Sequence, residues 1–218
     1  MDNLSLIENV HECIPPPATS SHPHTVRGRY QYYHYGCDGF DDRGWGCGYR
    51  TLQTLCSWAK YELTKSRAET ACVPSIPQIQ ETLVSIGDKS KQFLGSKNWI
   101  GSVEVAMCLD QLYNVSCKIV HVSSGRDLKE HTEVLTQHFD TKGAPVMMGG
   151  DADSASKGIM GICEADGVTY LLVLDPHYYG SDASASTLME KGFLLWRPLD
   201  SFMDSSFYNM CLPQLAAS

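Results

Sequence analysis

The sequence contains no C-x-x-C pair, and its nine cysteines are an odd number without regular spacing. A disulfide framework and a structural zinc site are therefore not expected, and reduced thiols are the simpler interpretation. No apolar stretch approaches the roughly 18 residues of a membrane-spanning helix, and the first residues lack the basic flank and apolar core of a signal peptide. These absences predict a cytoplasmic protein that does not insert into membranes.

Positive charge is also scarce, since 17 lysines and arginines stand against 25 aspartates and glutamates, a net charge of -8. Such a chain is not expected to bind nucleic acid. The glycine-rich stretch 149–158 lacks the Gly-Lys-Ser/Thr ending of a P-loop, so we expect a mobile loop and no phosphate site. His22 and His24 lack the third protein ligand that a zinc site needs, so we expect no metal.

The length of 218 residues suits one domain with a proper core. Residues 1–27 include a run of three prolines and show little hydrophobic periodicity. We therefore expect a flexible or extended tail laid on the domain surface, with a partner-binding role left open. Residues 28–218 are predicted to form the domain, and we expect the chain to act as a monomer.

Cys47 precedes a segment with helical periodicity. Small and apolar residues recur three or four positions apart through 48–63, which predicts an amphipathic helix with Cys47 on its first turn. Unpaired backbone N–H groups and the helix dipole favour the thiolate there, and the thiolate is the nucleophile. Gly46 and Gly48 would let a substrate carbonyl approach the sulfur closely. The alternative is a small buried cysteine at a helix start.

A second segment supplies an acid and a base. The apolar run 170–174 ends in Asp175-Pro176-His177, which predicts a buried strand with two polar side chains at its C-terminal end. Residues i and i+2 of an extended chain point to the same side. The Asp175 carboxylate could thus hold the His177 ring in one tautomer while its other nitrogen faces Cys47. Their separation of 130 positions (177 minus 47) resembles that of papain-like cysteine hydrolases.

Helices are predicted mainly in the first half of the chain and strands in the second. This order favours an α+β domain in which the helix carrying Cys47 packs on an antiparallel sheet. Ser75 and Gln78 stand in capping-box register, and Asp166-Gly167 marks a hairpin turn. We expect helices over 75–86 and 102–113, a helix capped by Asp127 and Glu130, and strands over 116–122, 145–148, 159–165, 168–174 and 192–197.

Residues 29–35 are rich in tyrosine, which is typical of an edge strand. A tyrosine hydroxyl from this segment could donate to a developing oxyanion beside the Cys47 N–H. The pattern alone does not choose among Tyr32, Tyr33 and Tyr35. Trp99 lies in the predicted loop 88–101, where it either packs beneath its own chain or lines a substrate groove.

Four motifs can be compared with known families: Tyr33-His34-Tyr35, Asp41-Asp42 through Gly44-Trp45-Gly46-Cys47, Asn98-Trp99-Ile100-Gly101 and Asp175-Pro176-His177. Together they resemble the proteases specific for ubiquitin-fold modifier 1, over about residues 29–200. Because no large domain precedes this region, we expect the chain to be similar to the short member of that family. Autophagy cysteine proteases that trim a ubiquitin-like protein also carry an Asp-Pro-His corner and are the nearest alternative.

The resemblance implies a papain-like fold without metal or cofactor. It implies Cys47 as nucleophile, His177 as general base and acid, and Asp175 as the group that orients His177. Tyr35 lies twelve positions before the cysteine (47 minus 35) and is implied as the oxyanion donor. The implied reaction is hydrolysis after the C-terminal glycine of the modifier, which matures its precursor or removes it from conjugated proteins.

A substrate that ends in glycine needs a tunnel too narrow for side chains. Trp99, Gly46 and Gly48 are the walls that we predict for it, because their side chains are flat or absent. Two other functions remain open on the sequence. The cleft could bind the modifier without cutting it, or the same fold could act as an amidase or acyltransferase on small amides.

Overall fold

The structure is a computed structural model that describes residues 6–20, 22–65, 72–153 and 155–217. Residues 1–5 and 21 of the predicted tail lie outside this description, as do residues 66–71, 154 and 218 of the predicted domain. The elements in chain order are η1 (Val10–Cys13), β1 (His24–Thr25), α1 (Cys47–Thr64), α2 (Ile76–Ser85), η2 (Lys91–Phe93), α3 (Ser102–Tyr113), β2 (Cys117–Val122), η3 (Gly125–His131), α4 (Thr132–Thr141), β3 (Val146–Gly150), β4 (Ser156–Ala165), β5 (Val168–Leu174), α5 (Ala185–Glu190), β6 (Leu194–Pro198), η4 (Leu199–Ser201) and β7 (Tyr208–Pro213).

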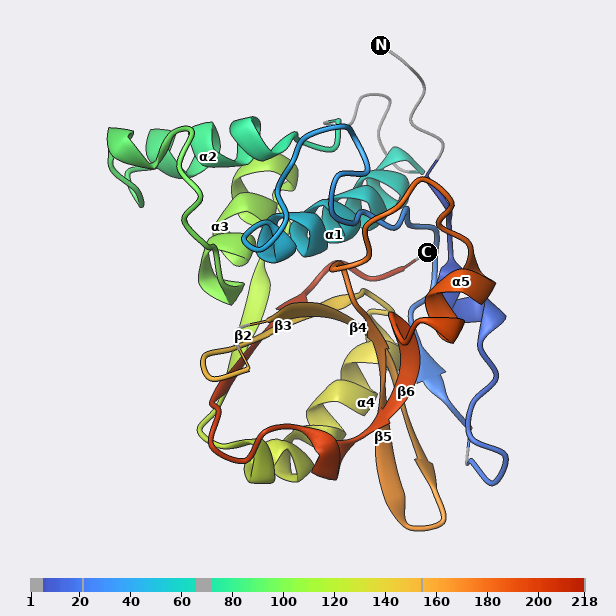
Figure 1. Ribbon diagram of the computed structural model, residues 1–218. Coiled ribbons are helices and arrows are strands. Elements are labelled where there is room, and N and C mark those ends of the chain that lie inside the picture. Colours follow the sequence, from blue (N-terminus) through green and yellow to red (C-terminus); the bar gives the residue numbers. More distant parts are fainter. Residues whose placement is uncertain (1–5, 21, 66–71, 154, 218) are drawn as a thin grey trace.

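The strands form one antiparallel sheet in the order β2-β7-β3-β4-β5-β6, and β1 adds to β4. Helices α1, α2 and α3 gather on one side of this sheet, and α4 lies on the other (Figure 1). The helix that begins at Cys47 therefore packs on an antiparallel sheet, as predicted. Among the helices of the described ranges, none combines the length and the apolar character that crossing a membrane requires.

Helix α1 lies at the centre and is buried on almost every side. Its apolar stripe, which includes Leu52, Leu55 and Trp58, is fully buried in the core. Each such side chain contributes roughly 1.5–3 kcal/mol of transfer free energy on burial. The opposite face is buried as well, but it is polar, and its hydroxyl and guanidinium groups bind the chain that precedes the helix.

Residues 29–35, all within the described part, do not form the predicted edge strand. The backbone N–H groups of Gln31 and Tyr33 donate instead to the hydroxyls of Ser57 (2.9 Å) and Thr54 (3.1 Å) on α1. The segment makes only single bridges, including one between Tyr35 and residue 179. The strand prediction was wrong because helix side chains and isolated contacts with residues 7, 9 and 176, and not a continuous neighbouring strand, satisfy this backbone.

Two further predictions of local structure were wrong. The helix expected to be capped by Asp127 and Glu130 begins as the 3-10 segment η3, whose N-cap is Ser124, and α4 follows only from residue 132. Half of the stretch 149–158 is strand, since Gly149 pairs with Ser156, and residues 149–150 and 156–158 belong to β3 and β4. Small residues suit this hairpin because a side chain at position 150 would collide with the ring of Tyr208.

Other local predictions are confirmed. Ser75 and Gln78 form a capping box at the start of α2, with both reciprocal hydrogen bonds present. Helix α3 spans the predicted residues 102–113. Asp166 and Gly167 turn the β4–β5 hairpin with positive φ angles of 51° and 74°, which is the backbone that a tight hairpin of this kind requires.

The described part of the predicted tail lies on the domain, and two of its side chains enter the core. Val10 and Val26 are buried in the hydrophobic core. The His11 ring is buried between the hydroxyl of Tyr30 (3.0 Å) and the carbonyl of Val26 (3.1 Å). These contacts bring His11 and Val26 beside Tyr30, within the segment 29–35.

Candidate active site

Cys47, Asp175 and His177 meet where α1 begins and β5 ends. Cys47 is the first residue of α1. Asp175 and His177 are the first and third residues after the end of β5 at Leu174. The Asp175 carboxylate contacts His177 Nδ1 and also accepts the His177 backbone N–H at 2.9 Å. On its other side, the His177 ring lies near the Cys47 sulfur, since each of these two groups shifts the pKa of the other. Two pieces of chain that are distant in sequence are therefore joined here.

The electrostatics of this cluster favour an ion pair. Burial raises the pKa of the Cys47 thiol, but hydrogen bonds from His177 and from the Ser156 backbone, together with the His177 charge, bring it below its ordinary value. Burial lowers the pKa of His177, but the hydrogen bonds to Asp175 and Cys47 outweigh it and raise this pKa to about 9. Each group therefore favours the charged form of the other, which stabilises a thiolate–imidazolium pair.

The pH dependence of kcat/KM is accordingly expected to be bell-shaped. As pH falls through the lowered pKa of Cys47, the thiolate takes up a proton and the rate declines. As pH rises past about 9, His177 loses its proton and the rate declines again. Each limb should change by about tenfold per pH unit, with apparent pKa values that belong to the pair. A steady-state series from pH 5 to about 10.5 measures this, and a rate that keeps rising to the end would contradict the assignment.

Tyr35 is the tyrosine that the structure places beside the sulfur. Its ring meets the His177 ring edge-on, with centroids 5.1 Å apart. Burial and the neighbouring Cys47 charge raise the pKa of Tyr35, so the hydroxyl keeps its proton. The Gly44 backbone acts in the lowering direction on this pKa, which places it beside the phenol oxygen. The hydroxyl also interacts with the Cys47 sulfur and lowers the pKa of that thiol, which places it beside the reacting atom.

The other two candidate tyrosines lie elsewhere. Tyr32 is fully buried, and its hydroxyl donates to the main-chain carbonyl of Asp175 at 2.5 Å. This contact fixes the corner that carries the acid and the base. The Tyr33 backbone is held by α1 through Thr54. Neither position was distinguishable from Tyr35 in the sequence, because all three stand in one aromatic run.

A cleft of about 220 Å³ opens beside the sulfur. Trp99 lies on this cleft with 57% of its surface exposed, as the groove prediction requires.

Gly46 and Gly48 are not among the described residues that line the cleft. A side chain at Gly46 would overlap the Asp42 carboxylate, and one at Gly48 would come within 2.5 Å of the Ile100 carbonyl. Both glycines thus permit close packing around the helix start. The cleft is lined by Cys47, Trp99, Ile100, Gly101, Ser102, Gly149, Gly150, Ala155, Ser156, Phe207 and Asn209.

Sequence reasoning missed the wall opposite Trp99. Ser156 supplies a backbone hydrogen bond to the Cys47 sulfur, and Asn209 lies in the cleft because β7 pairs with β3 at Gly149. No local pattern marks these residues, since only the pairing of distant strands brings them to the site. All nine cysteines, which fall within the described ranges, are free thiols. Those ranges contain no cluster of three or more side chains suited to holding a metal ion.

Comparison with known proteins gives consistent results. The family model of peptidase family C78 matches residues 21–211. The chain is 46% identical over 211 residues to "Ufm1-specific protease 1" of Mus musculus, covering 95% of this chain and 94% of that protein. It is 40% identical to "Ufm1-specific protease 2" of Homo sapiens, covering 95% of this chain and 44% of that protein.

A solved structure shares the fold. The crystal structure of UfSP from C. elegans matches with a TM-score of 0.82 at 37% identity, covering 98% of this chain and 38% of that one. The prediction of a papain-like α+β fold is confirmed by this match together with the family model.

Proposed function

This chain belongs to peptidase family C78 and is a cysteine peptidase, and we propose that it cleaves after the C-terminal glycine of a ubiquitin-fold modifier. The relatives named as Ufm1-specific proteases support ubiquitin-fold modifier 1 as that substrate, both as precursor and as conjugate. The observation that carries the proposal is the Cys47 thiol, with its pKa lowered by an imidazole that Asp175 holds, on the lining of a cleft that also includes Trp99. We propose that the protein acts in the cytoplasm as a monomer, without nucleic acid or membrane insertion.

The proposed reaction has two stages. The Cys47 thiolate attacks the carbonyl carbon of the terminal glycine, and the C=O electron pair moves to oxygen. The His177 imidazolium then protonates the leaving amine as the C–N bond breaks, which leaves a thioester. Neutral His177 next takes a proton from water, the hydroxide attacks the thioester, and the thiolate departs. Asp175 stabilises the imidazolium in each stage without itself taking a proton.

The oxyanion of each tetrahedral intermediate needs donors. We propose the Tyr35 hydroxyl and the Cys47 backbone N–H for this role. The first N–H groups of a helix have no partner within the helix, so the one at Cys47 is available. Two donors fixed before the reaction stabilise the developing charge without reorganising at the moment of attack.

Replacing Trp99 with alanine is expected to raise KM for the modifier about tenfold and to change kcat by less than about twofold. The indole is 57% exposed on the cleft, so its removal takes away contact area with the substrate without opening the core. Leu94→Ala is the matched control, since Leu94 is 45% exposed in the same loop and outside the cleft lining. Steady-state cleavage by both variants makes the comparison, and an unchanged KM in Trp99→Ala would remove this residue from the groove.

The direct test of the proposed function is a panel of precursors. The purified protein is incubated with precursors of several ubiquitin-like modifiers, and the products are weighed by mass spectrometry. We expect one modifier of the ubiquitin-fold class to be clipped after its glycine, with small amides left intact. Turnover of small amides with no precursor clipped would favour the amidase alternative.

A further inference from the structure

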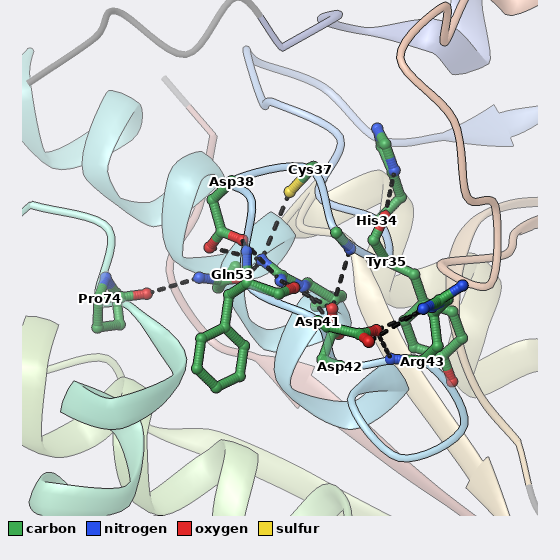
Figure 2. Close-up of polar contacts among 12 residues, drawn as sticks. His34, Tyr35, Cys37, Asp38, Asp41, Asp42, Arg43, Gln53 and Pro74 are labelled. Atoms are coloured by element: carbon green, nitrogen blue, oxygen red, sulfur yellow. Dashed lines mark hydrogen bonds and ion pairs between the residues drawn. The ribbon is translucent and has the colours of Figure 1, made fainter.

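Arg50 is a fully buried arginine one turn along α1 from Cys47. Its guanidinium donates to both oxygens of Asp38 (2.8 Å each) and to both oxygens of Asp42 (2.8 and 2.9 Å). Cys37, Asp38, Asp42 and Gln53 converge on this one guanidinium (Figure 2). The group ties two points of the loop 36–46 to the helix that carries the nucleophile.

Asp42 in turn holds two other residues of this loop through hydrogen bonds. One of its carboxylate oxygens accepts the Gly36 N–H at 2.9 Å, and its main-chain carbonyl accepts the Gly46 N–H at 2.8 Å. The carboxylate is fully buried, and Gly46 packs so closely on it that any side chain there would overlap it. The loop therefore cannot shift without breaking several short contacts at once.

These contacts bear directly on Tyr35. Gly36, which follows it, is fixed by Asp42, and the Tyr35 N–H donates to the Pro176 carbonyl at 3.0 Å. Gly44, whose backbone influences the pKa of the Tyr35 hydroxyl, lies in the turn that the Asp42 carbonyl closes by accepting the Trp45 and Gly46 N–H groups. Contacts with the Asp42 loop and with the Asp175-Pro176-His177 corner therefore both position Tyr35.

We infer that Asp42, anchored by Arg50, is a positioning residue that sets the Tyr35 hydroxyl against the reacting carbonyl at Cys47. The inference rests on the role of Tyr35 in the proposed function. A buried ion pair contributes little net stability, because the cost of desolvating both charges offsets their attraction. Two bidentate carboxylate contacts to one guanidinium do fix orientation, which is what an oxyanion donor needs.

The test compares two adjacent carboxylates. Asp42→Asn keeps the side-chain shape but weakens the link between Arg50 and Gly36, whereas Asp41→Asn removes a charge that pairs with Arg43 on the surface. We expect Asp42→Asn to lower kcat about 10- to 30-fold with KM within about twofold, and Asp41→Asn to leave both unchanged. Alkylation of Cys47 by iodoacetamide has no oxyanion intermediate, so its rate should stay within about twofold in both variants.

A double-mutant cycle separates positioning from general destabilisation. Tyr35→Phe should lower kcat about 100-fold, and adding Asp42→Asn to it should lower kcat further by less than about twofold. The position of the ring is read independently from the ¹³Cζ resonance of labelled tyrosine, assigned through Tyr35→Phe. Asp42→Asn should move this resonance, and Asp41→Asn should not. If Asp42→Asn does not fold, Arg50→Lys replaces it with the same expected results, because lysine cannot hold both carboxylates bidentately.

Equal falls of kcat in the wild-type and Tyr35→Phe backgrounds, or an unmoved Tyr35 resonance, would overturn the inference. A wild-type protein that cleaves no modifier would count against the proposed function, and the resonance would still report whether Asp42 places the Tyr35 ring.

Discussion

Replacing Cys47 with serine is expected to lower the rate of modifier cleavage by about 10⁴-fold or more. The reason lies in how the pair is tuned. His177 has its pKa raised to about 9 and holds a proton at neutral pH, so it suits a neighbour that is already ionised. A serine hydroxyl at position 47 would need a base to take its proton, and a protonated imidazole is not one.

Binding of the modifier should survive this substitution. The serine side chain is close to cysteine in size, and the cleft walls are contributed by other residues. Calorimetry should therefore give a dissociation constant within a few-fold of wild type. Cys72→Ser is the matched control, since Cys72 is an exposed thiol, and it should cleave normally. A Cys47→Ser protein that cleaves at the wild-type rate would refute the nucleophile assignment.

Replacing Asp175 with asparagine is expected to lower kcat by about 10³- to 10⁴-fold. The amide would present N–H donors to His177 Nδ1 and so favour the wrong tautomer of the ring. The fold at this corner should persist, because the Asp175 N–H donates to the Phe193 carbonyl at 2.7 Å and its carbonyl accepts the Tyr32 hydroxyl. The loss would thus come from chemistry and not from unfolding.

The same variant should also alter the pH profile. The Asp175 carboxylate is the largest of the influences that raise the pKa of His177, so without its charge this pKa falls. The alkaline limb of kcat/KM should then move to lower pH than in wild type. Asp182→Asn serves as the control, because Asp182 accepts the Tyr178 hydroxyl at 2.6 Å, and its profile should match wild type. An Asp175→Asn enzyme with wild-type kcat and an unmoved alkaline limb would exclude Asp175 as the orienting group.

What the sequence could predict was local. The helix that begins at Cys47 follows from periodicity. The strand that leads to Asp175 was also predicted, but residues 176 and 177 form a turn, in which the Asp175 carboxylate accepts the His177 N–H at 2.9 Å, and not the extended chain that we expected. Neighbouring residues alone determine the helix and the strand. The capping box of α2 and the turn at residues 166–167 were predictable for the same reason.

What the sequence could not predict depends on distant pieces of chain. Residues 29–35 have strand composition, yet the hydroxyls of α1 hold them outside the sheet. Asn209 and Ser156 reach the cleft only through the pairing of β7, β3 and β4. Arg50 would be expected on an exposed helix face, and its burial follows from two aspartates in a loop whose path no periodicity reveals. Tertiary contacts decided each of these cases.

The central claim is that Cys47 is the thiol that forms the acyl-enzyme with the modifier. It is tested most directly by incubating the protein with ubiquitin-fold modifier 1 that ends in an electrophile in place of its terminal carboxylate, followed by peptide mass spectrometry. We predict one adduct, on the peptide that contains Cys47, and its complete loss in Cys47→Ser. An adduct on any other of the nine cysteines, or no adduct at all, would contradict the account.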